Sequence, residues 1–153
     1  MMRLFDPSRR MRAALLAIAL LASSVAVSAE EYLGRLSSNP YSPDSIANPF
    51  GAGSPYRANG LLNPYSPYGS RLSDRSWTNP YATRPPILVD DDGRFRGTLS
   101  ANPFDPNSIS NPYGRYGSRY SPDSIRNPFG AGSPFRIDSP SNPYGRGLII
   151  RGR

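Results

Sequence analysis

One seventeen-residue phrase occurs twice in this chain of 153 residues. Residues 41–57 read YSPDSIANPFGAGSPYR, and residues 120–136, which begin 79 positions later, read YSPDSIRNPFGAGSPFR. Self-similarity of this kind indicates an array of one small unit and argues against a single catalytic constellation. We therefore expect a mostly irregular, partly disordered fold of Pro-, Gly- and Asn-rich turn repeats.

The chain begins with the three parts of a secretory signal peptide. Four arginines lie within residues 1–12, an uncharged apolar run fills residues 13–27, and Val27-Ser28-Ala29 supplies small residues for cleavage. A membrane anchor is the alternative, but this run has fifteen residues, whereas a spanning helix needs about twenty. We expect a signal peptide at residues 1–29, cleavage after Ala29 and export to the periplasm or beyond the cell. The membrane would be a partner only through this signal.

The composition of the exported part limits both its core and its partners. Removal of the signal takes away four arginines and one aspartate, which lowers the formal net charge from +7 to +4. The remaining arginines are spread singly, which argues against nucleic acid as a partner. The chain has no cysteine for disulfides, and Leu, Ile, Val and Phe are too few for a large core. Many small aromatic contacts are expected in its place.

The repeated unit is Asn-Pro-aromatic, which occurs eight times. Proline keeps the preceding Asn out of the helical region and fixes φ at the first central position of a turn, while the Asn side chain can bond to the backbone ahead of it. Each unit is thus a turn that presents one ring. The Asn-Pro-Phe triplets suggest peptide recognition, but packing of Phe50, Phe104 and Phe129 on neighbouring repeats is the favoured interpretation. The candidate interaction or packing rings are Tyr41, Phe50, Tyr65, Tyr81, Phe104, Tyr113, Phe129 and Tyr144.

A second motif lies between these units. Ser42–Ile46 and Ser121–Ile125 read Ser-Pro-Asp-Ser-Ile, and residues 105–109 vary the same pattern. A capping Ser, a Pro at the first helical position and an early Asp favour the start of a helix. We expect short 3₁₀ turns, with one buried isoleucine in each: Ile46, Ile109 and Ile125.

Regular structure is expected in the second half. Ile87–Val89 and Phe95–Leu99 flank an Asp-Gly turn, which predicts a small β-hairpin over residues 87–99. Residues 147–151 form a further strand candidate that could join it. Residues 32–51 also align with residues 95–114, so the halves are copies at the level of sequence.

These patterns divide the chain into four parts. The signal at 1–29 precedes a first repeat block at 30–57, a Pro-, Gly- and Ser-rich spacer at 58–85 and a second block with the hairpin at 86–153. The spacer loses the Ser-Pro-Asp-Ser turns and contains the only tryptophan, Trp77.

The frame from Asp92 to Ser118, followed by Tyr-Ser-Pro-Asp-Ser-Ile at residues 120–125, resembles bacterial secreted or periplasmic repeat proteins. Their motifs are YSPDSI-x-NPFGAGSP and SNPYGRYGS, and the resemblance covers nearly all of the exported part. It implies an exported repeat protein and carries no assigned activity. The chain departs from the pattern between Leu61 and Thr83, which leaves the packing of that segment open.

The residue inventory argues against an enzyme. The chain lacks His, Cys and Lys, and with them the commonest general base, the thiol nucleophile, the Schiff-base amine and the preferred ligands of transition metals. Adjacent acids do not form a glycosidase pair, and residues 90–93 lack the ligand spacing of a calcium loop. We expect no catalytic residues, no metal and no cofactor.

A structural or adhesive protein of the cell envelope is thus expected, with envelope polysaccharide or protein as its partner. The alternative is a small glycan-active or calcium-dependent envelope enzyme that uses Asp44, Asp90, Asp91, Asp92, Asp105 or Asp123. A secreted effector or peptide precursor has only the signal in its favour.

Overall fold

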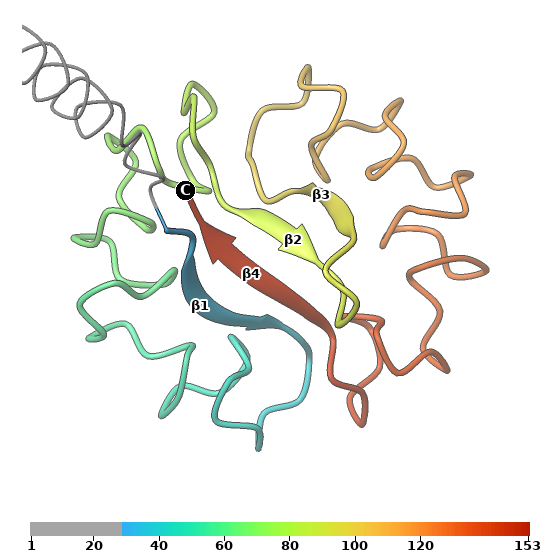
Figure 1. Cartoon of the computed structure of the whole chain (residues 1–153), viewed down its shortest axis with the longest axis horizontal. Coiled ribbons are helices and arrows are strands. Elements are labelled where there is room, and N and C mark those ends of the chain that lie inside the picture. Colours follow the sequence, from blue (N-terminus) through green and yellow to red (C-terminus); the bar gives the residue numbers. More distant parts are fainter. Residues whose placement is uncertain (1–28) are drawn as a thin grey trace, which may run out of the picture.

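A computed structural model describes residues 29–153, in which four strands form one antiparallel sheet and no helix occurs (Figure 1). The strands are β1 (Glu31–Leu36), β2 (Ile87–Val89), β3 (Phe95–Thr98) and β4 (Leu148–Gly152), in the order β1-β4-β2-β3. Within this part of the chain, nothing is both helical and long enough to cross a bilayer. The expected signal peptide lies outside the described residues, apart from Ala29.

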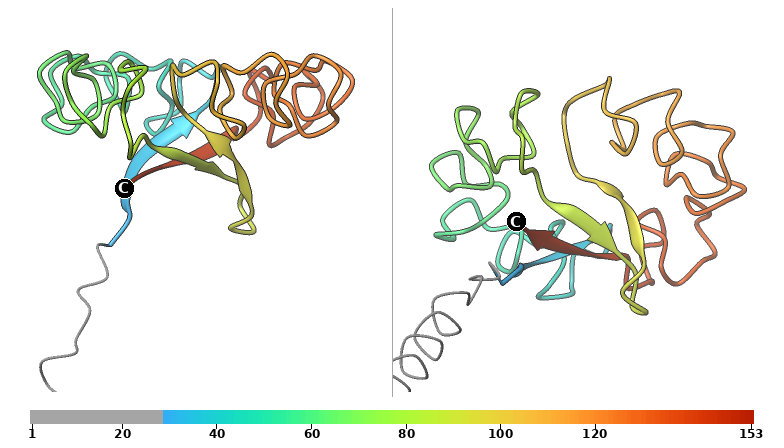
Figure 2. Two further views of the ribbon diagram at one scale, coloured as in Figure 1. Left: turned by 90° about the horizontal axis from the view of Figure 1, so that it is seen from above. Right: turned by 45° about the horizontal axis from the view of Figure 1, so that its top comes forward.

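Two long irregular segments connect the strands and lie on the same side of the sheet (Figure 2). The first array, residues 37–86, runs from β1 to β2, and the second array, residues 99–147, runs from β3 to β4. A small apolar cluster lies where the sheet meets the arrays, and its members are Leu33, Leu61, Tyr68, Leu88, Leu99, Leu148 and Ile150. The sheet and the arrays therefore share the one apolar cluster found among the described residues.

The expected hairpin is present. β2 pairs with β3, and Gly93 in the connecting turn has φ +79°, a conformation that glycine adopts without a steric penalty. The C-terminal strand is also present, and it pairs with β2 on one side and β1 on the other. β1 was not expected as a strand. It contains Gly34 with φ +121° beside a register shift, and Gly97 of β3 has a similar φ of +114°.

Matching contacts relate the two halves across the centre of the sheet. Leu88 of β2 lies opposite Ile150 of β4, with paired residues on either side of them. Ser45 makes an isolated parallel bridge to Arg35, and Ser108 makes the same bridge to Thr98, which places equivalent residues 63 positions apart. The seventeen-residue phrase has a spacing of 79. Its two copies therefore occupy different positions in the two arrays.

The arrays consist of β-turns that follow one another every three residues. The chain thus divides into triplets, and the first residue of a triplet is the one whose carbonyl accepts the hydrogen bond of the turn. The N–H of Ser45 donates to the carbonyl of Ser42, that of Asn48 to Ser45 and that of Gly51 to Asn48, and the series continues through both arrays. Thirteen prolines occupy the second position of such a turn, where their fixed φ is suitable and no N–H is needed. A one-residue insertion occurs once in each array, at Gly69 and at Gly117.

Side chains satisfy the remaining backbone donors. The first residue of a triplet is usually Asn or Ser, and its side-chain oxygen accepts the N–H of the third residue, as between Asn48 and Phe50 at 2.9 Å. Asparagine does more, because its amide also donates to the carbonyl six residues earlier. Asn48, for example, binds the carbonyl of Ser42 at 3.1 Å. Asparagine thereby ties successive turns together, and the hydroxyl of Ser66 makes the same tie to the carbonyl of Gly60.

The inside of each array is polar and narrow. The fully buried residues include the first residues of several triplets: Ser45, Ser66, Ser76, Ser108, Ser124 and Ser139. The Oγ atoms of Ser45 and Ser108 donate to the carbonyls of Ser37 and Ser100. The interior of the arrays is therefore held together by hydrogen bonds from hydroxyl and backbone groups, where an ordinary interior is held together by apolar contacts.

The Ser-Pro-Asp-Ser-Ile motifs and their variant form single turns with the three-residue hydrogen bond that a 3₁₀ turn has, but they are β-turns and not 3₁₀ helices. The carbonyl of the first residue accepts an N–H three positions on, and the next turn begins there before a helical turn can continue. Ile46, Ile109 and Ile125 pack against the apolar cluster and are partly buried. The triplet turns also continue through residues 58–85, so no change of local structure coincides with the expected spacer.

Candidate interaction surface

The eight candidate rings all point into solvent. Their exposed fractions run from 88% for Tyr81 and Phe104 to 98% for Phe129. No pair of them is in ring-to-ring contact, since Phe95 and Tyr116 form the aromatic pair found in residues 29–153. The expectation that Phe50, Phe104 and Phe129 pack on neighbouring repeats is therefore wrong.

The geometry of the triplet explains this outward direction. Each of these rings belongs to the third residue of a triplet, whose N–H is held by the side chain of the first. The first residue of these triplets faces the interior, where neighbouring turns approach so closely that a Cβ on Gly51 would meet a backbone carbonyl. The eight rings therefore lie on the outside. Tyr68 and Tyr116, the third residues directly before the two insertions, are buried instead, against Gly152 of β4 and Gly97 of β3.

Sequence reasoning missed four side chains of the same kind. Tyr56, Leu72, Tyr120 and Phe135 are third residues of triplets and are 92–94% exposed. The signal that could have revealed them is the spacing of the prolines in multiples of three, interrupted once in each array. We call the complete set of twelve, eleven aromatic residues and one leucine, the outer ring set: Tyr41, Phe50, Tyr56, Tyr65, Leu72, Tyr81, Phe104, Tyr113, Tyr120, Phe129, Phe135 and Tyr144.

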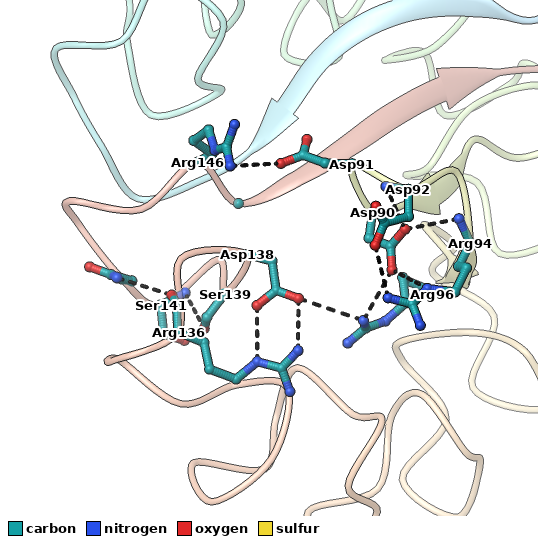
Figure 3. A network of polar contacts seen from close by, with 12 residues as sticks. Asp90, Asp91, Asp92, Arg94, Arg96, Arg136, Asp138, Ser139, Ser141 and Arg146 are labelled. Carbon is teal, nitrogen blue, oxygen red and sulfur yellow. Dashed lines mark hydrogen bonds and ion pairs between the residues drawn. The ribbon is translucent and has the colours of Figure 1, made fainter.

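The aspartates of the hairpin turn bind arginines (Figure 3). Asp90 is buried, accepts the N–H groups of Asp92 and Arg94, and forms an ion pair with Arg94 at 3.1 Å. Arg96 lies 3.6 Å from both Asp90 and Asp138, which joins the hairpin to the second array. These contacts favour a structural role for the turn.

Asp91 extends the same network toward β1. Its carboxylate lies 2.7 Å from Arg35 and 3.5 Å from Arg146. Ion pairs thereby join the hairpin turn to β1 through Arg35 and to the end of the second array through Arg146.

Two carboxylates of this network have lowered pKa values. Burial acts to raise the pKa of Asp90, but the N–H and charge of Arg94 and the N–H of Asp92 outweigh it and lower the pKa below the ordinary value. Hydrogen bonds from Arg136 to Asp138, at 2.8 and 2.9 Å, are the main cause of the lowered pKa of Asp138. Both groups therefore stay ionised at neutral pH.

The other aspartates proposed for an enzyme lie apart in the turns. Asp105 accepts the N–H of Asn107, Asp123 pairs with Arg115 at 2.6 Å, and Asp44 is exposed in the first array. Within residues 29–153, no group of three acidic side chains is placed to hold a metal ion. The structure thus brings the rings outward in a common setting and does not bring the aspartates together.

Comparison of the whole chain with family models, curated proteins and solved structures found no match in any of the three. The functional argument therefore depends on the site itself.

Proposed function

We propose that this chain is an exported, non-enzymatic repeat protein of the cell envelope that binds its partners through the outer ring set. The observation that carries the proposal is the 88–98% exposure of twelve large apolar side chains. The turns hold these side chains in the open, where they are available to contact a partner. The signal-like sequence at residues 1–29 supports export.

Many weak contacts suit a structural or adhesive role. A single exposed ring contributes little affinity, but rings linked on one scaffold bind together and raise the total strength. Tyr and Phe replace one another in the outer ring set, which indicates that the ring face matters more than the hydroxyl. An aromatic face binds the apolar side of a sugar ring, a proline or another aromatic ring. Envelope polysaccharide and envelope protein are therefore the partners that fit.

The test is co-sedimentation of the purified protein with peptidoglycan, neutral and acidic polysaccharides and anionic vesicles, and pull-down of envelope proteins. Replacing Tyr41, Tyr65, Tyr113 and Tyr144 by Ser, one after another, should weaken binding in steps as rings are removed. Replacing the same tyrosines by Phe is the matched control, because it keeps every ring. Binding to none of these partners, or equal binding by the Ser and Phe series, would refute the proposal.

A further inference from the structure

Three adjacent hollows run across the junction of the two arrays. The central hollow has a volume of about 550 Å³ and takes its lining from both arrays, including Trp77 of the first and Ile109 of the second. A hollow of about 480 Å³ in the first array shares Arg71, Trp77 and Thr78 with it. A third, of about 620 Å³ in the second array, shares Arg126. We call this series the junction groove.

Arginines with free charges gather in the junction groove. Of the fourteen arginines in residues 29–153, only Arg57, Arg71, Arg119 and Arg126 have no ion pair or side-chain hydrogen bond within that range. Arg71, Arg119 and Arg126 line the groove, and all three are exposed. The groove therefore presents positive charge that no neighbouring acid neutralises.

Arg71 and Arg119 occupy equivalent positions in the same four-residue motif, which occurs once in each array. Each follows the Gly-Ser pair at the one-residue insertion, in Tyr-Gly-Ser-Arg, and each takes the second position of a triplet, where proline is otherwise common. Proline would suit this turn position at least as well. Local turn geometry therefore does not require an arginine at either position.

Trp77 supplies a fixed aromatic wall in the groove. Its indole Nε1 donates to the carbonyl of Leu61 at 2.8 Å, and its backbone N–H donates to the carbonyl of Tyr68 at 3.3 Å. The ring is partly buried and packs against the apolar cluster. Trp77 is thus held in place before any ligand binds, which lowers the entropy cost of binding.

We propose that the junction groove binds an acidic polysaccharide, with a sugar ring on Trp77 and carboxylates at Arg71 and Arg126. A chain of uronic acids combines the groups that the groove matches: a ring with an apolar face, carboxylates for guanidinium groups, and hydroxyls for Ser and Thr side chains. The spread of arginines over adjacent hollows suits an extended polymer. Of the outer ring set only Leu72 lines these hollows, so the site goes beyond the proposed function.

Trp77 makes the proposal directly testable, because it is the only tryptophan of the chain. Tryptophan fluorescence is followed while the purified protein is titrated with a short oligogalacturonate, with the uncharged oligogalactoside of the same length, and with single-stranded DNA. The acidic oligosaccharide should change the emission and saturate, and added salt should weaken it. The uncharged sugar should bind at least about tenfold more weakly, since charge-assisted hydrogen bonds are lost.

Substitution identifies the residues responsible. Arg71→Gln and Arg126→Gln should each weaken oligogalacturonate binding about tenfold, whereas Arg57→Gln, which changes an equally free arginine outside the groove, should leave it unchanged. Unaltered far-ultraviolet circular dichroism shows that each variant is folded. No fluorescence change, equal binding of the uncharged sugar, equal loss in the Arg57 variant, or tighter binding of DNA would each overturn the proposal. The serine series of the outer ring set leaves Trp77 in place, so the two proposals can fail separately.

Discussion

The inner and outer faces of the turn arrays reverse the usual distribution of side chains. Inner positions are Ser and Gly, and Ser45, Ser108 and Ser124 are completely buried. Outer positions carry Phe and Tyr that are almost completely exposed. The difference shows what a turn every three residues imposes: the backbone fills the interior and hydrogen bonds hold it. Large rings lie outside, except for Tyr68 and Tyr116 where the arrays meet the sheet.

Apolar burial still matters where the arrays meet the sheet. Leu88 and Ile150 lie opposite each other at the centre and are completely buried. Leu72 has the same kind of side chain on the outer face and is 94% exposed. These two leucines give the sharpest test of the contrast between inside and outside.

Leu88→Ala should cause the largest loss, about 2–5 kcal/mol of unfolding free energy, because it removes buried methyl groups and leaves a cavity. Leu72→Ala, as the matched control, should change stability by less than about 0.5 kcal/mol. Urea unfolding followed by circular dichroism measures both. Similar losses in the two variants would show that Leu72 is buried in solution or that Leu88 is not.

Glycine positions test how tightly the inner face is packed. A Cβ on Gly51 would meet the carbonyl oxygen of Pro43, whereas Gly93 in the hairpin has nothing within 4 Å. Gly51→Ala should therefore cost about 1–3 kcal/mol, as overpacking does. Gly93→Asn should cost less than about 1 kcal/mol, since Asn tolerates positive φ. Thermal unfolding compares them, and an unaffected Gly51 variant would mean that the turns can separate easily.

The amide of asparagine should be worth about 1–2 kcal/mol where it ties turns together. In Asn127→Asp the turn keeps its acceptor, as it does at Asp105, but the carbonyl of Ser121 loses the donor that lies 3.0 Å away. Asn39→Asp is the control, because Asn39 accepts the N–H of Tyr41 at the start of its array and makes no bond six residues back within the described residues. Equal unfolding midpoints for the two variants would contradict this role.

Acid should loosen the contact between the hairpin and the second array. The pKa values of Asp90 and Asp138 are lowered in the folded state, so their stabilisation is complete above the unfolded pKa of about 3.9 and is lost as pH falls below it. Unfolding free energy should therefore stay level near neutral pH and decline below about pH 4. In Asp138→Asn the decline should be shallower, and a slope identical to that of the parent protein would exclude Asp138 as a contributor.

Local chemistry made some of this structure predictable from the sequence. The Asp-Gly turn between Ile87–Val89 and Phe95 predicted the hairpin, and the apolar run at residues 148–150 predicted the last strand. β1 was not predicted, although residues 32–36 align with the predicted strand at 95–99 and Gly34 matches Gly97. The alignment was the available signal, whereas the pairing of β1 with β4, more than a hundred residues away, is not visible in the local sequence.

The direction of the rings was predicted wrongly for a related reason. The expectation that Phe50 and its equivalents pack inside follows from the general burial of apolar residues, which assumes that an interior has room for them. The triplet period was visible in the prolines, and it would have indicated an interior of backbone and serine. The contacts of Trp77 and the free charges of Arg71 and Arg126 depend on how the arrays meet, which no local pattern shows.

The smallest effect on stability should come from the residues that matter most for the proposed binding. Phe50 and Phe129 are exposed almost completely, and each contributes to its turn only through a backbone N–H that Ser would provide equally well. Phe50→Ser and Phe129→Ser should therefore change the unfolding free energy by less than about 0.5 kcal/mol. Urea unfolding measures this, with Leu88→Ala as the reference for a buried side chain. A loss above about 1 kcal/mol would show that the rings are buried in solution, against neighbouring turns or against a second copy of the chain. Concentration-independent unfolding of the parent protein would separate those two cases, because only self-association makes stability rise with protein concentration.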